Sequence, residues 1–326
     1  MGVNARLYAY ALDAAVRKYQ MWGATNKIFV ALMTDSYTPN QAVDQTWNGT
    51  NGISANEITG ATNYTTNGKA LTFPGTYYYY DSTGTPGGTM KLKADSITWA
   101  NLTTDTDIKY AVIYTQNNIN NTGLTNPLIG WITFPTPISC AGEDFTIDWT
   151  DDYVISIALD TANPSAPYAR MQGTFWLKAF SNEIDFNDGK WTLALVTNSW
   201  APNQDSPSFS YIHGIIPTAN SSPELAATGN YTRKVLANMS SNYTPPVSGY
   251  GGHWDFTAGN VVWSNLTSSA DFYFAVLFYD TSVDTESAVV GYINLNGAQS
   301  ATNQNVTIAW DSGVVFQVSL DTAADT

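Results

Sequence analysis

Apolar residues near the start of the chain recur every three to four positions, as on one face of a helix. The same spacing returns in the middle of the chain, so the pattern predicts two amphipathic helices. The apolar stripes consist of Leu7, Ala11, Ala15 and Tyr19 in the first, and of Met171, Phe175, Ala179 and Phe180 in the second.

After each predicted helix the hydrophobic pattern changes to the period of two that is typical of strands. The runs "YAVIY" and "FAVLF", at 110–114 and 274–278, are continuously apolar and predict strands covered on both faces. The runs "FTIDW" and "VTIAW", at 145–149 and 306–310, alternate apolar with polar residues. Each is followed by a short polar turn and another apolar run, which predicts a closing β-hairpin in each half.

These elements occur twice in the same order, so the chain is predicted to be a tandem duplication. "LMTDSYTPNQ" at 32–41 returns as "LVTNSWAPNQ" at 195–204. "WANLT" at 99–103 returns as "WSNLT" at 263–267, and "LIGWI" at 128–132 returns as "VVGYI" at 289–293. We therefore expect a mainly β fold of two antiparallel sandwich-like or barrel-like domains, 1–163 and 164–326, each with an N-terminal helix. Two prolines in 163–167 mark the linker.

The repeated decapeptide reads as the exit turn of a buried strand. Pro39 and Pro202 fix φ and end strand pairing, and the asparagine after each favours a turn. Tyr37 and Trp200 are expected to form an aromatic lid over the edge of the core.

Composition narrows the class of partner. Only 12% of residues are charged and the net charge is −14, without any cluster of Lys and Arg, which argues against nucleic acid and anionic membranes as partners. A single cysteine, Cys140, allows no disulfide within the chain. We expect neither a secretory signal at Met1 nor a transmembrane helix.

The residue types that carry catalysis are sparse. His213 and His253 both lie in the second half and outside any nucleophile motif. The carboxylate pairs Asp105/Asp107 and Asp151/Asp152 fit turns better than a glycosidase dyad, and the loop "DSTGTPGG" at 81–88 lacks the ligand run of an EF-hand. We expect no enzyme activity, no cofactor and no metal site.

The middle loops differ most between the halves and are rich in aromatic residues. Such side chains, mixed with Gly and Pro, suit an interaction surface, although they can equally pack inward where a strand starts. The candidate interaction residues are Tyr77, Tyr78, Tyr79 and Tyr80 in the first half, and Tyr243, Tyr250, His253 and Trp254 in the second.

The order of these motifs resembles a small module encoded in the structural gene regions of tailed bacteriophages. That module carries an E-(I/V)-x-G-x-x-Y-T-x-x-G-x-x-L stretch, then W-x-N, a Y-A-V-I-Y strand and P-L-I-G. The first half matches across 4–160 and the second more loosely, since the glycine after Tyr-Thr is gone and Arg233 and Lys234 follow directly. The matching positions of the long stretch are Glu57, Gly60, Tyr64, Thr65, Gly68 and Leu71, and then Glu224, Tyr231, Thr232 and Leu236.

This resemblance implies a virion structural protein, assembled in the host bacterial cytoplasm and without catalytic residues. It favours a capsid decoration (cement) or head-fibre protein that oligomerises on the particle and contacts the major capsid protein. A tail, neck or baseplate component in contact with other tail proteins is the first alternative. A carbohydrate-binding module that uses the aromatic loops as stacking platforms is the second.

Overall fold

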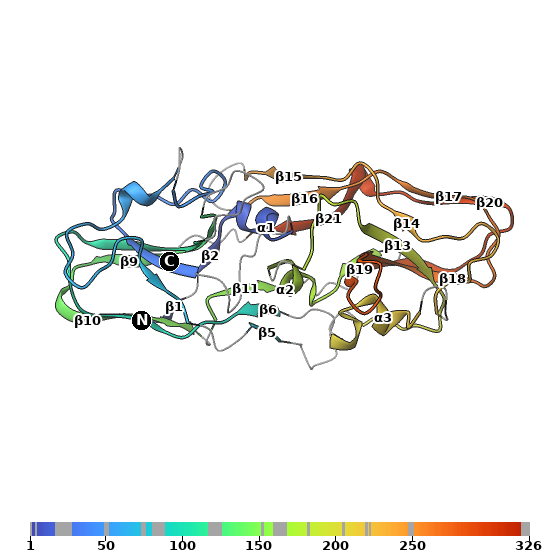
Figure 1. Cartoon of the computed structure of the whole chain (residues 1–326). Coiled ribbons are helices and arrows are strands. Elements are labelled where there is room, and N and C mark those ends of the chain that lie inside the picture. The colour runs from blue at the N-terminus through green and yellow to red at the C-terminus, as the bar shows by residue number, and fades with distance from the viewer. Residues whose placement is uncertain are drawn as a thin grey trace.

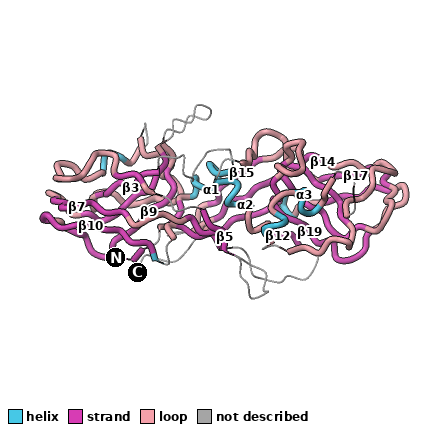
Figure 2. Tube along the Cα trace, turned by 60° about the horizontal axis from the view of Figure 1, so that its bottom comes forward, coloured by secondary structure: helices cyan, strands magenta, loops and turns pink. Residues whose placement is uncertain are grey.

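The protein is a mainly β chain with two strand-rich ends and two helices in the middle (Figures 1 and 2). This computed structural model describes residues 2–3, 5–16, 28–48, 52–72, 76–79, 89–116, 126–150, 153–158, 168–180, 183–203, 206–218, 221, 223–246 and 251–320. The predicted fold class is confirmed, since each half of the chain forms antiparallel sheets with a short helix near its start.

Each half builds a five-stranded sheet with the same topology. The strand order is β2-β9-β8-β3-β4 in the first half and β12-β19-β18-β13-β14 in the second. The first sheet comprises β2 (Arg6–Leu7), β3 (Ile28–Met33), β4 (Lys69–Ala70), β8 (Ile108–Thr115) and β9 (Leu128–Ile138). The second comprises β12 (Tyr168–Met171), β13 (Trp191–Val196), β14 (Lys234–Val235), β18 (Phe272–Tyr279) and β19 (Ala288–Gln299). The two halves thus have the same strand order, which fits the repeated sequence motifs.

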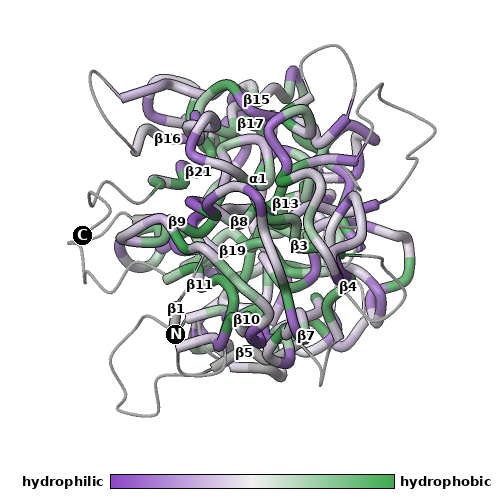
Figure 3. Tube along the Cα trace, turned by 90° about the vertical axis from the view of Figure 1, so that its left-hand side faces the viewer, coloured by the Kyte–Doolittle hydropathy of each residue, from purple (hydrophilic) through white to green (hydrophobic). Residues whose placement is uncertain are grey.

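The continuously apolar runs are the middle strands of these sheets, as predicted. Along β8, Ala111 and Ile113 belong to the main core, whereas Val112 and Tyr114 belong to a smaller core on the opposite face. A strand with a core on each side needs apolar residues at successive positions. In Figure 3, viewed along the long axis, hydrophobic residues gather in the inner strands and hydrophilic ones towards the periphery.

A second layer of strands covers the main core in each half. It contains β7 (Ile97–Thr103), β10 (Ala141–Trp149) and the short parallel strand β1 (Gly2–Val3) in the first half. The second half has β17 (Val261–Leu266) paired with β20 (Gln304–Ile308). Alternate residues of these strands are buried, for example Phe145 and Ile147 along β10.

The two predicted closing hairpins are wrong. β10 pairs with β7, whereas the next strand, β11 (Ile155–Ala158), pairs with β6 (Thr89–Leu92) in another sheet. Likewise β20 pairs with β17, whereas β21 (Val314–Ser319) pairs with β16 (His253–Thr257). In the second half a 3₁₀ turn at Asp311–Gly313, with Ser312 and Gly313 at positive φ, turns the chain away from its predecessor. The polar residues at this position predict a turn, but they do not predict which strand pairs with the strand that follows it.

Two three-stranded sheets fill the middle of the molecule, above and below the helices (Figures 1 and 2). One has the order β11-β6-β5, with β5 at Thr76–Tyr79, and the other β15-β16-β21, with β15 at Ser240–Thr244. Helices α1 (Ala9–Val16) and α2 (Phe175–Phe180) lie between them. A third helix, α3 (Ile212–Ile215), lies in the second half.

The helices begin later along the chain than the hydrophobic pattern predicts. Leu7 and Met171, expected to open the helical stripes, lie in edge strands β2 and β12 of the five-stranded sheets. Tyr19 lies outside the described residues. The alternation of apolar and polar residues cannot be recognised over so few positions, so the sequence pattern assigns both edge strands to the helices that follow them.

Main-core residues of both halves form one contiguous hydrophobic cluster. Backbone contact between the halves includes the Phe186 N–H, which donates to the Val16 carbonyl at 2.6 Å. The predicted domain boundary at residues 163–164 lies outside the described residues, so the division into two domains stays a prediction.

The exit turns cap a second, outer core on each five-stranded sheet. Tyr37 and Trp200 are 4% and 6% exposed and belong to these outer cores. Tyr37 meets Tyr110 edge-on at 5.8 Å, and Trp200 meets Phe274 in the same way at 5.4 Å. The aromatic lid predicted from the repeated phrase is therefore present in both halves.

Candidate functional site

The glutamate and tyrosine of the repeated motif form a buried latch in the first half. Tyr64 donates its hydroxyl hydrogen to Glu57 Oε1 at 2.6 Å, and the same hydroxyl oxygen accepts the Leu32 N–H at 3.0 Å. The Asn67 N–H also donates to Glu57 Oε1, at 2.7 Å. Burial raises the pKa of Glu57 above its usual value, and the hydrogen bonds from Tyr64 and Asn67 act in the opposite direction.

The second half repeats this latch and adds an arginine. Tyr231 donates to Glu224 Oε1 at 2.9 Å and accepts the Leu195 N–H at 2.9 Å. Arg233 Nη2 lies 3.0 Å from Glu224 Oε2, and Arg233 Nη1 lies 2.9 Å from Asp284 Oδ1. The Glu224 side chain is fully buried, so the arginine supplies the charge that its carboxylate needs. The two motif glutamates thus fasten a loop to a strand in both halves.

The repeated W-x-N motif shapes a bulge in the covering strands. Asn101 and Asn265 both adopt a φ of 52°, a left-handed conformation that asparagine tolerates well. Their carbonyls accept side-chain amide hydrogens from Asn63 and Asn230, at 2.9 and 3.2 Å. The shared asparagines therefore serve backbone geometry.

The repeated glycine of "LIGWI" and "VVGYI" gives room for an edge strand. A Cβ at Gly130 would lie 2.3 Å from the Arg6 carbonyl oxygen, and one at Gly291 would lie 2.3 Å from that of Arg170. Only glycine therefore lets β2 and β12 pair at these positions.

Helix α1 of the first half packs against β16 of the second. Trp254 Nε1–H donates to the Ala9 carbonyl at 2.5 Å, and the Trp254 ring meets Tyr10 edge-on at 5.7 Å. Ser241 donates its hydroxyl hydrogen to Asp13 Oδ1 at 2.7 Å. These contacts join segments more than 200 residues apart in the sequence.

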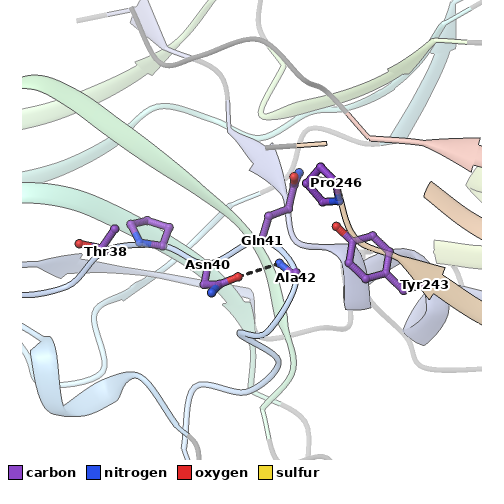
Figure 4. A pocket seen from close by; sticks show the side chains of 7 residues that line it. Thr38, Asn40, Gln41, Ala42, Tyr243 and Pro246 are labelled. Carbon is purple, nitrogen blue, oxygen red and sulfur yellow. Dashed lines mark hydrogen bonds between the residues drawn. The ribbon is translucent and has the colours of Figure 1, made fainter. Parts of the chain in front are cut away.

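A pocket of about 370 Å³ opens beside this junction (Figure 4). It is lined by the exit turn Thr38–Ala42 of the first half and by Tyr243 and Pro246 of the second. Gln41 bridges the two sides, since its Nε2 donates to the Leu7 carbonyl and its Oε1 accepts the Gly251 N–H at 2.8 Å. The Tyr243 hydroxyl donates to the Gly251 carbonyl at 2.7 Å. The bond from Gly251 to Gln41 joins the two halves, whereas the bonds of Gln41 to Leu7 and of Tyr243 to Gly251 each lie within one half.

The candidate interaction residues of the second half lie close together but play different roles. Trp254 is 4% exposed, so its ring offers no face to a partner. Tyr243 is half-buried and lies 5.6 Å from Trp254, ring centroid to centroid. His253 is half-buried, with Nε2 3.4 Å from Asp255 Oδ2 two residues along the same strand. Tyr250 lies outside the described residues.

In the first half, Tyr77, Tyr78 and Tyr79 lie in β5, opposite Lys91, Met90 and Thr89 of β6. They belong to a regular strand rather than to a loop. Tyr80 lies outside the described residues, so its role as an interaction residue stays a prediction.

Sequence reasoning missed the polar residues that build the junction pocket. Gln41 is 4% exposed and contacts both halves of the chain. The available signal is the "PNQ" that ends both copies of the repeated decapeptide, which on sequence grounds predicts only a turn. A buried glutamine that joins distant segments has no local sequence pattern.

Other chemical candidates remain apart. Cys140 is buried, and burial raises the pKa of its thiol above the usual range. His213 is exposed on α3, and Asp105 and Asp107 lie exposed in the turn before β8. The loop 81–88 and the pair Asp151/Asp152 lie outside the described residues. Within the described ranges, no three His, Cys, Asp or Glu residues converge as metal ligands, and no helix is long and apolar enough to cross a membrane.

Comparison with known proteins gives no family for this chain. No protein-family model matches the sequence, and neither a curated protein nor a solved structure matches it.

Proposed function

We propose that this chain is a virion structural protein of a tailed bacteriophage. Its role is that of a capsid decoration or head-fibre protein, held to the outside of the particle by protein–protein contacts. The observation that supports this proposal is the role of the motif residues that both halves share. They are engaged in latches, bulges and strand crossings rather than in a reactive centre.

The internal duplication makes this observation informative. Two copies that have diverged elsewhere keep the Glu–Tyr latch, the left-handed asparagine and the crossing glycine. Each of these residues fixes the backbone, and the charged or polar groups of the latches are consumed by partners within the chain. A virion structural protein acts through its shape and its contacts, so the residues that both halves would be expected to keep are those that hold the fold.

Two further features fit a particle surface. The chain is acidic and sparsely charged, and it is rich in Asn, Thr, Ser and Gly. Two similar modules in one chain can also occupy two quasi-equivalent positions on a symmetric shell. The motif order of the first half resembles modules from phage structural gene regions, and this resemblance is the reason for proposing a phage particle.

The test is the location and copy number of the chain in purified particles of the phage that encodes it. We expect immunogold label on the heads and a copy number, measured by quantitative mass spectrometry, close to a simple ratio with the major capsid protein. Particles that lack the chain should have heads that break at lower temperature but adsorb to cells normally. Purified wild-type chain should rebind to those heads.

Two outcomes would contradict the capsid assignment. Label on the tail with a low copy number would assign the chain to the tail, neck or baseplate. Absence of the chain from intact particles would overturn the virion role altogether. A folded variant in the rebinding experiment, such as Gly259→Ala, controls for effects of purification, since a Cβ there meets its nearest neighbour at 3.4 Å, an ordinary contact distance.

A further inference from the structure

A second pocket, of about 530 Å³, lies on the surface of the second half. Three segments line it: the exit turn Thr197–Ser199, the latch segment Glu224–Ala226, and the start of β18 with the turn before it, which contribute Tyr273 and Ser269, Ala270 and Asp271. Its volume falls within the range of roughly 300–1,000 Å³ that small-molecule sites occupy.

Main-chain hydrogen bonds hold all three segments in place. The Thr197 N–H donates to the Pro223 carbonyl at 2.8 Å, and the Leu225 N–H donates to the Leu195 carbonyl at 3.1 Å. The Ser268 N–H, next to the third segment, donates to the Ala301 carbonyl at 2.9 Å. The walls are therefore formed before any ligand arrives, which lowers the entropic cost of binding.

Several polar groups in this pocket have unused hydrogen-bonding capacity. The side chains of Asn198, Ser269 and Asp271 are exposed, and none of them makes a hydrogen bond or ion pair within the described part of the chain. Glu224 differs, because its carboxylate is fully buried and bound by Tyr231 and Arg233. The half-buried Tyr273 adds an aromatic ring to the same wall.

The duplication provides an internal comparison for this site. Alignment of the repeats places Asp35, Asp105, Asp107 and Lys109 of the first half at the positions of Asn198, Ser269, Asp271 and Tyr273. The first half therefore has three carboxylates where the second has one, and it lacks the ring. Lys109 also directs its Nζ to the Phe134 carbonyl at 2.7 Å. At three of the four positions the first half has a charged side chain, and the second half has an amide, a hydroxyl or an aromatic group instead.

We propose that this pocket in the second half binds a neutral saccharide. A sugar ring presents hydroxyl groups that both donate and accept hydrogen bonds, together with an apolar face of C–H groups. Asp271 is an acceptor for hydroxyl hydrogens, and Asn198 and Ser269 can each donate or accept. The Tyr273 ring offers area to the C–H face of the sugar at little conformational cost.

Charge argues against the other classes of small ligand. Among the described residues that line the pocket there is no lysine or arginine, and Asp271 would repel an anionic sugar or a phosphate. A single accessible carboxylate provides too few oxygen ligands to hold a hard cation such as Ca²⁺. A neutral polyhydroxylated ligand can form hydrogen bonds with each of these free polar groups. Saccharide binding would be a second function, in addition to the proposed role as a virion building block.

The test uses the full chain and a panel of neutral oligosaccharides of glucose, galactose, mannose and N-acetylglucosamine. Saturation-transfer NMR identifies a binder, and titration calorimetry measures its affinity. We expect Tyr273→Ala, which loses the ring contact, to weaken binding at least about tenfold. Asp271→Asn keeps an acceptor oxygen but loses the charge, and it should weaken binding by about threefold or more. Tyr273→Phe, which keeps the ring, should stay within about threefold of wild type.

Matched changes in the first half serve as controls. Lys109→Ala and Asp107→Asn alter the equivalent positions and should leave saccharide affinity unchanged. Circular dichroism verifies that every variant is folded. The absence of binding by any neutral oligosaccharide at millimolar concentration, or binding unaffected by Tyr273→Ala, would overturn the proposal. Because this measurement needs no virus particle, its failure leaves the virion assignment standing, and the reverse also holds.

Discussion

The arginine of the second latch provides the most demanding test of how the motif residues stabilise the fold. Arg233 forms a two-pronged contact with Glu224, whose side chain is fully buried, and a second pair with Asp284, whose side chain is 18% exposed. Replacing Arg233 with methionine keeps an apolar stem of similar length but leaves the Glu224 carboxylate without a countercharge.

The magnitude follows from the burial of Glu224. Loss of one partner from a buried ion pair costs about 3–5 kcal/mol, since the remaining charge is desolvated and uncompensated. The partly exposed Asp284 adds no more than about 1 kcal/mol. We therefore expect Arg233→Met to lower the free energy of unfolding of this part of the chain by about 3–5 kcal/mol.

The assay is urea unfolding at pH 7 followed by tryptophan fluorescence. In the variant the Glu224 carboxylate stays buried and keeps the Tyr231 hydroxyl as a donor, but it has lost its countercharge. The double variant Arg233→Met/Glu224→Gln should recover at least about 1 kcal/mol. A loss below about 1 kcal/mol at pH 7, or no recovery in the double variant, would refute the structural role assigned to this pair.

Three further predictions concern the shared motifs. Burial raises the pKa of Glu57 above its ordinary value, so its ionised form destabilises the fold at neutral pH. This cost disappears as the pH falls through the raised folded value towards 4.5, so the unfolding free energy of wild type relative to Glu57→Gln should increase on acidification. A difference that does not change with pH would contradict this. Trp263 donates its indole N–H to the Thr232 carbonyl at 2.8 Å, whereas the buried Trp99 N–H has no partner within the described residues. In thermal or urea unfolding, Trp263→Phe should therefore cost about 1 kcal/mol more than Trp99→Phe. Equal costs would argue against that hydrogen bond. Gly130→Ala should destabilise by more than about 2 kcal/mol because its Cβ would overlap a strand carbonyl, while Gly259→Ala should change the unfolding free energy by less than about 1 kcal/mol, and similar values for both would count against the crossing described here.

The central elements were predictable because their signals are local. The runs at 110–114 and 274–278 could be assigned to doubly covered strands from their residues alone, and β8 and β18 have a core on each face. Tyr37 and Trp200 were recognised as core lids because the same phrase occurred twice in the same context. The duplication provided a second reading of every such element.

Partners at long range could not be predicted in this way. The strand after "FTIDW" is a strand as predicted, but its partner is β6, more than 60 residues earlier, rather than its neighbour. Edge strands β2 and β12 are too short to show alternation and are held by backbone pairing at Gly130 and Gly291. Trp254 could be recognised as an important aromatic residue, but the surface that covers it comes from α1, at the other end of the sequence.

The contact between Ala9 and Trp254 has a consequence for how this protein is made. The two residues are 245 positions apart, and α1 packs against strands near the end of the chain. At translation rates of about 5–20 residues per second, the ribosome needs roughly 12–50 seconds to deliver the second partner after the first. During that interval α1 lacks the strand β16 against which it packs in the folded chain, so the middle of the molecule is assembled only after most of the first half has been synthesised.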